Sequence, residues 1–204
     1  MIKTFITTIS LQARGDLRTI FYNPQGFELK NNCETCFPII PVIASETESE
    51  ENIKIIAIRT VNHDTKDNYE VFLNEIENLG ISKDKVTQIS VEENQSKTIG
   101  MNMLMNILKE IPEDSLVFTD ITFGTKPMSS ILLYAMTYIE KLNKDVEVEG
   151  IYYGELPREN GKVAYERASL YDLTAYKYLS DVIEELNHLE VKNPLAALEK
   201  LLKM

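Results

Sequence analysis

The feature that most constrains the fold of this 204-residue chain is an alternation of short apolar runs with segments of helical periodicity. The runs are rich in β-branched and aromatic residues, which favour strands. In the segments between several of them, apolar residues recur at the three- and four-residue spacing of an amphipathic helix. The expected strands are residues 2–9, 53–60, 86–91, 116–121 and 146–153, and the expected helices are residues 69–79, 97–111 and 127–142. Strands alternating with helices predict a mostly parallel sheet covered by helices on both faces.

Three further segments are less regular. Residues 37–43 are apolar, but Pro38 and Pro41 cannot donate to a sheet ladder, so an edge strand or an extended connector is expected there. The polar stretch of residues 10–32 is broken by turn residues and predicts a ligand loop or a hairpin. Residues 162–170 predict a short strand pair or a hairpin edge.

The C-terminal part predicts two helices, over residues 173–189 and 194–202, with Asn193-Pro194 as the start signal of the second. The leucines of the last helix form a narrow apolar stripe. Such a stripe packs on the domain, pairs with a second subunit or leads into another domain.

The charge balance excludes one class of partner. A formal net charge of -11 repels a long polyanion, and no run of lysine and arginine marks a surface for duplex DNA or RNA. A small anionic ligand stays compatible with this charge, because backbone N–H groups at a helix start and one or two cations suffice to bind it.

Membrane insertion and secretion are not expected. The longest apolar runs, such as residues 37–44, are far shorter than the ~20 residues that span a bilayer, and the N-terminus lacks the pattern of a signal peptide. A cytoplasmic location is therefore expected.

Cys33 and Cys36 form a single C-x-x-C motif, which fits a redox pair or half of a metal site. The chain has no second cysteine pair and only two histidines, His63 and His188, whereas a closed zinc site usually needs four ligands. We expect two unpaired loop thiols and no metal site.

The most informative segment is residues 117–129, where a buried strand ends in a polar turn and an apolar helix begins. Gly124 allows a close backbone approach, Thr122 and Thr125 add hydroxyls, and Lys126 adds a cation. This pattern suits an anion beyond the carboxyl end of a strand. The alternative is that Thr125 caps the helix, Pro127 occupies its first turn and Lys126 is solvated.

The turn matches neither common nucleotide motif, because both the Walker A pattern and G-x-G-x-x-G are missing. No cofactor is expected.

The segment DITFGTKPMSSILLYAMTYIEKL resembles the strand-turn-helix signature of the CARF (CRISPR-associated Rossmann fold) family. FPIIPVIA with IKIIAIRT resembles the early strands of that family, and IYYGELP with LYDLTAYKYLSDVI resembles its last strand and the following helix. These segments occur in the family's order.

The resemblance implies a Rossmann-like α/β domain over residues 1–190. It also implies a homodimer that binds one cyclic oligoadenylate made during type III CRISPR antiviral defence and regulates an effector. Residues 191–204 are then a helix that makes a dimer contact or links to an effector domain. The number of adenylates in the ring is left open.

Carried over by position, the resemblance places ligand contacts after two strands. They are Thr8, Ile9, Ser10, Leu11 and Gln12 after the first strand, and Thr122, Phe123, Gly124, Thr125, Lys126 and Met128 in the later turn. Asp120 is expected to hold that turn through its N–H groups, because a bare carboxylate facing phosphates repels them. Arg14, Arg18 and the Tyr152-Tyr153-Gly154 segment are second choices for ligand contact.

Two alternatives to a binding module remain. Some members of the CARF family are ring nucleases that slowly cut their activator without a metal, and Ser10, Thr122, Thr125 and Lys126 are the candidates for that chemistry here. The other alternative is an unrelated Rossmann-like nucleotide-binding protein or enzyme, or a transcription regulator.

Overall fold

A computed structural model describes residues 1–13, 15–47, 52–61 and 63–202. The chain folds around one seven-stranded sheet, with the strand order β3-β11-β8-β7-β1-β5-β6. The five strands from β8 to β6 are parallel, β11 runs antiparallel to β8, and β3 is parallel to β11. The strands of the sheet are β1 Ile2–Thr8, β3 Asn23–Gln25, β5 Ile53–Thr60, β6 Val86–Val91, β7 Ser115–Asp120, β8 Val146–Glu155 and β11 Ser169–Asp172. The expected α/β class with a mostly parallel sheet is thus confirmed.

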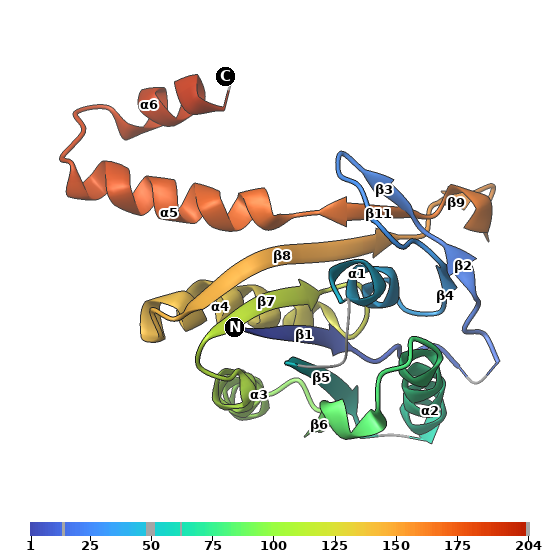
Figure 1. Cartoon of the computed structure of the whole chain (residues 1–204). Helices are drawn as coiled ribbons and strands as arrows, with labels where there is room; N and C mark the ends of the chain where they lie inside the picture. The colour runs from blue at the N-terminus through green and yellow to red at the C-terminus, as the bar shows by residue number, and fades with distance from the viewer. Residues whose placement is uncertain (14, 48–51, 62, 203–204) are drawn as a thin grey trace.

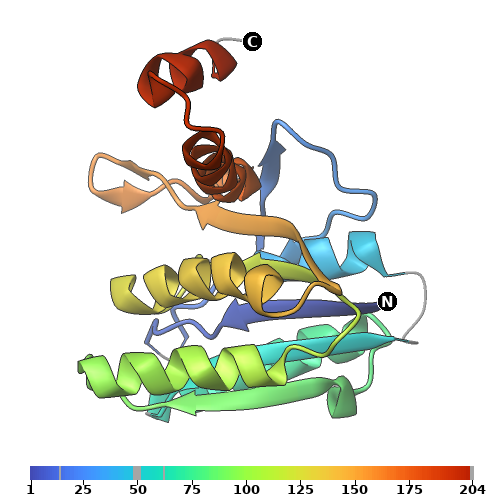
Figure 2. The same cartoon turned by 90° about the vertical axis from the view of Figure 1, so that its left-hand side faces the viewer.

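Helices cover both faces of the sheet, as Figure 2 shows. Alternate residues of β5 serve the two faces: Ile55 packs with the cores of α1 and α2, and Ile56 packs with those of α3 and α4. The helices are α1 Ile39–Glu46, α2 His63–Asn78, α3 Lys97–Glu110, α4 Lys126–Leu142, α5 Thr174–His188 and α6 Pro194–Leu201. Both faces of the central strands are therefore buried, as a parallel sheet requires.

Local signals account for where several helices begin. The Ser96 hydroxyl accepts a hydrogen bond from the Ile99 N–H at the start of α3, and the Asn193 side chain accepts one from the Ala196 N–H at the start of α6. Pro127 lies in the first turn of α4, where its missing N–H costs no helical hydrogen bond.

The expected edge strand or extended connector at residues 37–43 is wrong, because α1 occupies this segment. Pro38 is the N-cap residue and Pro41 is the third residue of the helix. The first four N–H groups of a helix have no acceptor within it, so neither proline removes a helical hydrogen bond. The apolar residues Ile39, Ile40, Val42 and Ile43 are all buried.

The short strands lie in the segments that the sequence left irregular. Between residues 10 and 36, β2 Ile20–Phe21 pairs with β4 Glu34–Thr35, and β3 joins the edge of the sheet. Residues 158–172 contain the pair of β9 Arg158–Glu159 and β10 Lys162–Val163, followed by β11. The strand pair thus lies mostly before the expected residues 162–170, and β11, which begins at the end of that range, belongs to the main sheet.

The C-terminal helices extend beyond the sheet. In Figure 1, α5 leaves the end of β11 and α6 folds back along it, away from the strands. Two ion pairs hold α5 against α4: Lys177 with Glu140, and Lys141 with Glu184. Cys33 and Cys36 are free thiols, as expected. Within the described ranges, no helix is both long and apolar enough to cross a membrane.

Candidate functional site

The topology of the sheet singles out one place for a ligand. From β1 the chain first forms β3 at the far edge of the sheet, then returns to β5 and β6 on one side of β1, and then crosses back to β7 on the other side. The next parallel neighbours, β5 and β8, therefore lie on opposite sides of the β1–β7 pair, and open α/β sheets bind ligands in the crevice at the carboxyl ends of such a pair. The residues after β1 and the turn after β7 meet there.

Asp120, the last residue of β7, organises the turn. Its side chain is fully buried, and it accepts hydrogen bonds from the Thr122 N–H at 2.9 Å and from the Thr122 hydroxyl. Its other carboxylate oxygen accepts a hydrogen bond from the Thr7 hydroxyl at 2.9 Å. Asp120 thus ties the β7 turn to β1, which agrees with its expected structural role.

Burial raises the pKa of the Asp120 carboxyl from its usual value near 4 to about 6, although the hydrogen bonds from Thr122 and Thr7 partly oppose this rise. The physical cause is the loss of water around the charged form.

Three further hydrogen bonds fix the two segments. The Thr8 hydroxyl donates to the Phe123 carbonyl at 2.6 Å, and the Thr122 hydroxyl accepts from the Gly154 N–H at 2.7 Å. The Thr125 hydroxyl donates to the Gln95 side chain at 2.7 Å. The turn after β7 is therefore bound to β1, to β8 and to the loop before α3, so it is set in place before any ligand arrives.

The loop after β1 is held from α2. The Asn68 side chain donates to the Ser10 carbonyl at 2.9 Å and to the Gln12 carbonyl at 3.0 Å. The Ser10 hydroxyl is buried and accepts a hydrogen bond from the Gln12 N–H at 3.2 Å. Leu11 is exposed, so it is the most accessible residue of this loop among Ile9 to Gln12.

The start of α4 leaves donors for a ligand. Thr125 is the N-cap residue, but its side chain makes no cap hydrogen bond. The interpretation of Thr125 as a side-chain cap is therefore wrong, because its hydroxyl is taken by Gln95. The N–H groups of Lys126 and Met128 lie in the first turn of the helix, where the peptide dipoles favour an anion. The Lys126 side chain itself is exposed.

Gly124 has a backbone conformation that favours glycine, with φ at +88°. A Cβ atom on Gly124 lies 3.3 Å from Met128 Sδ and 3.5 Å from Thr8 Cβ. Gly124 thus sits between Thr8 and the start of α4, where the packing leaves little room for a side chain.

No family model matches this chain, and no curated protein matches it. Among solved structures, it is similar to Csm6 of Enterococcus italicus bound to cyclic hexa-2'-fluoro-hexa-dAMP, with a TM-score of 0.48 and 9% sequence identity. The match covers 98% of this chain and 50% of the Csm6 chain, so this chain spans half the length of that protein.

The structure brings together most of the residues that the sequence singles out. Two of them are core residues: Ile9 packs with the α1 and α2 side, and Met128 packs with the α3 and α4 side. Phe123 packs edge-on against Phe37, with ring centroids 5.8 Å apart. Ile9, Met128 and Phe123 therefore pack beneath the candidate site, so they define its shape.

The residues expected as second choices for ligand contact lie in different environments. Arg18 is exposed and lines a small hollow together with Gln12 and Phe123. Tyr152 is buried, whereas Tyr153 is partly exposed. Arg14 lies outside the described residues.

Sequence reasoning missed three contributors to the site. Asn68 and Gln95 hold the two turns, and Tyr165 lines the hollow beside Gln12 and Phe123. Asn68 and Tyr165 lie far along the chain from the residues predicted for the site. Gln95 lies just before the start of α3, outside the segment of residues 117–129. Only the folded chain brings them together.

Chemically, the arrangement offers donors to an anion more readily than it offers reactive hydroxyls. The hydroxyls of Ser10, Thr122 and Thr125 are all engaged in hydrogen bonds within the protein. Lys126 is the member of the proposed cleavage set that has an exposed polar group. Among the described residues, no group of three or more histidine, cysteine, aspartate and glutamate side chains is placed to hold a metal ion.

Proposed function

We propose that this chain is a sensor domain that binds a cyclic oligoadenylate at the carboxyl ends of β1 and β7 and regulates an effector through a homodimer. The observation that supports the proposal best is the fixed turn at residues 121–125. It lies at the switch point of the sheet, Lys126 beside it is exposed, and the first-turn N–H groups of α4 have no side-chain cap from Thr125. The nature of the ligand follows from the CARF resemblance of the sequence.

We place binding ahead of cleavage as the activity of this site. A ring nuclease must align the ribose 2′-hydroxyl with the phosphate and stabilise the charge that develops. The hydroxyls of Ser10, Thr122 and Thr125, which were expected to assist cleavage, form hydrogen bonds that hold the two turns in place. The site is therefore a cradle of fixed turns with one exposed cation, Lys126. Such a cradle stabilises a bound anion without requiring any bond to break.

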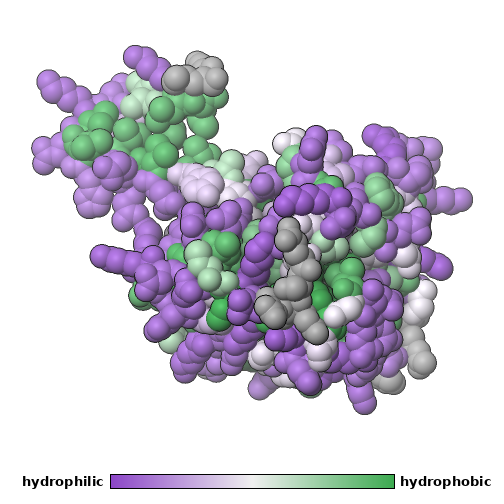
Figure 3. All heavy atoms as spheres, viewed as in Figure 1, coloured by the Kyte–Doolittle hydropathy of each residue, from purple (hydrophilic) through white to green (hydrophobic). Residues whose placement is uncertain are grey.

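Exposed apolar side chains support self-association. Figure 3 shows hydrophobic residues gathered over α5 and α6, at the end of the molecule that projects from the sheet. A soluble monomer rarely leaves a large contiguous apolar surface open. The exposed large apolar residues of these helices and of the segments beside them are Tyr176, Tyr178, Ile183, Leu189, Leu195, Leu201 and Leu202.

We therefore expect a homodimer in solution at micromolar concentration, because a two-fold ligand matches an isologous interface and these helices need cover. Light scattering coupled to size exclusion, with and without cyclic tetra- and hexaadenylate, measures the mass. A monomer under every condition contradicts the dimer.

Lys126→Ala is expected to weaken binding of cyclic oligoadenylate by about 10- to 100-fold while leaving the melting temperature unchanged. The reason is that a hydrogen bond to a charged group is worth roughly 1.5–3 kcal/mol, whereas an exposed lysine adds little to stability. Isothermal titration calorimetry with each ring size gives the affinity.

Lys144→Ala is the matched control, because Lys144 is also exposed but lies just before the amino end of β8, at the opposite edge of the sheet. It removes the same charge and is expected to leave the affinity within twofold of the wild type. Equal affinities for the wild type and Lys126→Ala remove Lys126 from the site. Failure of the wild type to bind any ring size contradicts the proposed function itself.

A further inference from the structure

The outer edge of β6 is open. β6 is the last strand of the sheet, and it pairs with β5 on one side, while no described strand pairs with its other side. In Figure 1 it lies at the lower margin of the molecule, beside α3. An open edge presents unpaired N–H and C=O groups that another strand can bind.

The register shows which residues present these groups. The Val91 carbonyl accepts a hydrogen bond from the Val61 N–H at 2.8 Å, just past the end of β5, so Val91 faces β5. In a parallel ladder the N–H and C=O of one residue point to the same side, and the side alternates along the strand. Val86, Gln88, Ser90 and Glu92 therefore direct their backbone groups outward.

β6 lacks the devices by which proteins usually protect an edge. These devices are charged side chains, proline, bulges or a very short strand. The six residues of β6, VTQISV, contain no charge, proline or glycine, and they pair with β5 without a register shift. The six residues of β6 thus carry none of these protections, although the strand lies at the edge.

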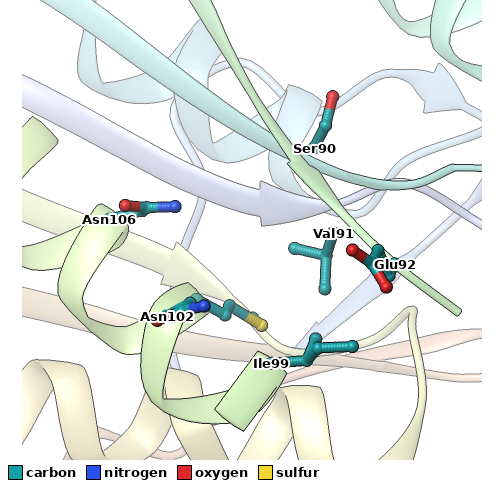
Figure 4. A pocket seen from close by; sticks show the side chains of 7 residues that line it. Ser90, Val91, Glu92, Ile99, Asn102 and Asn106 are labelled. Atoms are coloured by element: carbon teal, nitrogen blue, oxygen red, sulfur yellow. The ribbon is translucent and has the colours of Figure 1, made fainter. Parts of the chain in front are cut away.

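A hollow runs between this edge and α3. Figure 4 shows Ser90 and Glu92 on the strand side of the hollow and Asn102 and Asn106 on the helix side. Both asparagines are exposed, and neither carboxamide has a hydrogen-bond partner among the described residues. The side of α3 next to the edge is therefore polar, with donors and acceptors available to a neighbouring chain.

We propose that β6 pairs antiparallel with β6 of a second copy of this chain, so that two sheets join into one. The charges that flank the strand select this partner. Lys85 precedes the strand and Glu93 follows it, and neither side chain has a described partner. Antiparallel self-pairing places each of them beside the opposite charge on the other copy.

The outward-facing residues also fix the register. Hydrogen-bonded pairs of an antiparallel ladder must join outward residues on both strands. The register with the greatest overlap pairs Gln88 with the partner's Ser90 and centres the two-fold axis on Ile89. In the same register Lys85 faces the partner's Glu93, and the axis repeats that contact.

This interface goes beyond the proposed function. Across an axis of this kind the carboxyl ends of the two sheets point in opposite directions, so the two candidate ligand sites face away from each other. The β6 interface therefore joins homodimers of the proposed function into larger assemblies without closing a ligand pocket. Its effect on mass can be measured separately from ligand affinity.

The charge contact gives a reciprocal test. Lys85→Glu and Glu93→Lys each place like charges opposite one another at two symmetric positions, and each is expected to raise the dissociation constant of this interface by about tenfold. The double variant Lys85→Glu/Glu93→Lys restores opposite charges and is expected to regain the wild-type constant. Sedimentation velocity over a range of concentrations, without ligand, measures all four proteins. If the double variant stays as weak as the single variants, the register is wrong.

Ser90→Pro tests the backbone pairing itself. It removes an N–H that points outward, so the ladder with β5 stays intact, and it is expected to reduce the assembly to the homodimer of the proposed function. Ser90→Thr is the control, because it keeps the N–H and favours a strand. Ligand affinity is expected to stay within twofold of the wild type in both variants. An unchanged mass for Ser90→Pro, with circular dichroism showing that it is folded, overturns the interface.

Discussion

Gly124→Val is expected to abolish binding of cyclic oligoadenylate even in the fraction of protein that stays folded. The φ of +88° at this position strains any β-branched residue, at a cost of about 1–3 kcal/mol. The new side chain also enters the space between Thr8 and Met128, since the Cβ atom alone comes within 3.5 Å of both residues. Titration calorimetry on folded protein, isolated by size exclusion well below its melting temperature, measures the affinity.

Gly80→Val separates strain from blockage. Gly80 follows α2 and has φ at +78°, but a Cβ atom there meets no other atom within 4 Å. It therefore carries a similar backbone cost far from the switch point, and a lower melting temperature with normal affinity is expected. If Gly124→Val behaves in the same way, Gly124 serves only the stability of the turn and the crevice is not the ligand site.

The order of the main elements could be predicted from the sequence because it depends on local pattern. The expected strand at residues 53–60 has the bounds of β5, and the expected helix at residues 127–142 differs from α4 by one residue. Periodicity and β-branched content mark these elements in the sequence itself. The prediction for residues 37–43 was wrong because it considered only that Pro38 and Pro41 cannot donate to a sheet ladder. Both prolines occupy helix positions that tolerate them.

The short strand β3 could not be predicted for a different reason. It has three residues, including Pro24, and its place in the sheet comes from pairing with β11, which lies far along the chain. No local propensity marks such a segment as a strand. Tertiary pairing alone decides it.

For the candidate site, the sequence predicted which residues gather but not what their side chains do. Thr125 and Gln95 are 30 residues apart, and Thr8 and Phe123 are 115 residues apart. A threonine in the sequence does not reveal whether its hydroxyl binds a ligand or a distant group of the protein. The structural role of Asp120 was predictable, because an ionised carboxylate beside the phosphates of the proposed ligand is unfavourable whatever the fold.

Asp120→Asn is expected to change the pH dependence of stability by roughly 3 kcal/mol between pH 7.5 and pH 4. The raised pKa, about 6, means that the folded state holds the proton more tightly than the unfolded state does. The cost of the buried charge is therefore fully present above pH 6 and is relieved as the pH falls toward 4. A difference of about two pH units corresponds to this free energy.

The amide fits the same position. Its oxygen accepts from the Thr122 N–H and hydroxyl, and its NH2 group faces the Thr7 hydroxyl, which can turn to donate to the Thr8 carbonyl at 3.4 Å. Asp120→Asn is thus expected to be more stable than the wild type at pH 7.5 and equal to it near pH 4.

Urea unfolding of both proteins across this pH range gives the difference directly, and other carboxylates cancel because both proteins share them. Asp84→Asn, which changes an exposed carboxylate, is the control, and its curve is expected to run parallel to that of the wild type. If the Asp120→Asn curve is also parallel, the Asp120 carboxyl titrates in the folded protein as it does in the unfolded chain. In that case its hydrogen bonds to Thr122 and Thr7 offset the whole cost of burial, and the ionised carboxylate fastens the turn without a penalty at neutral pH.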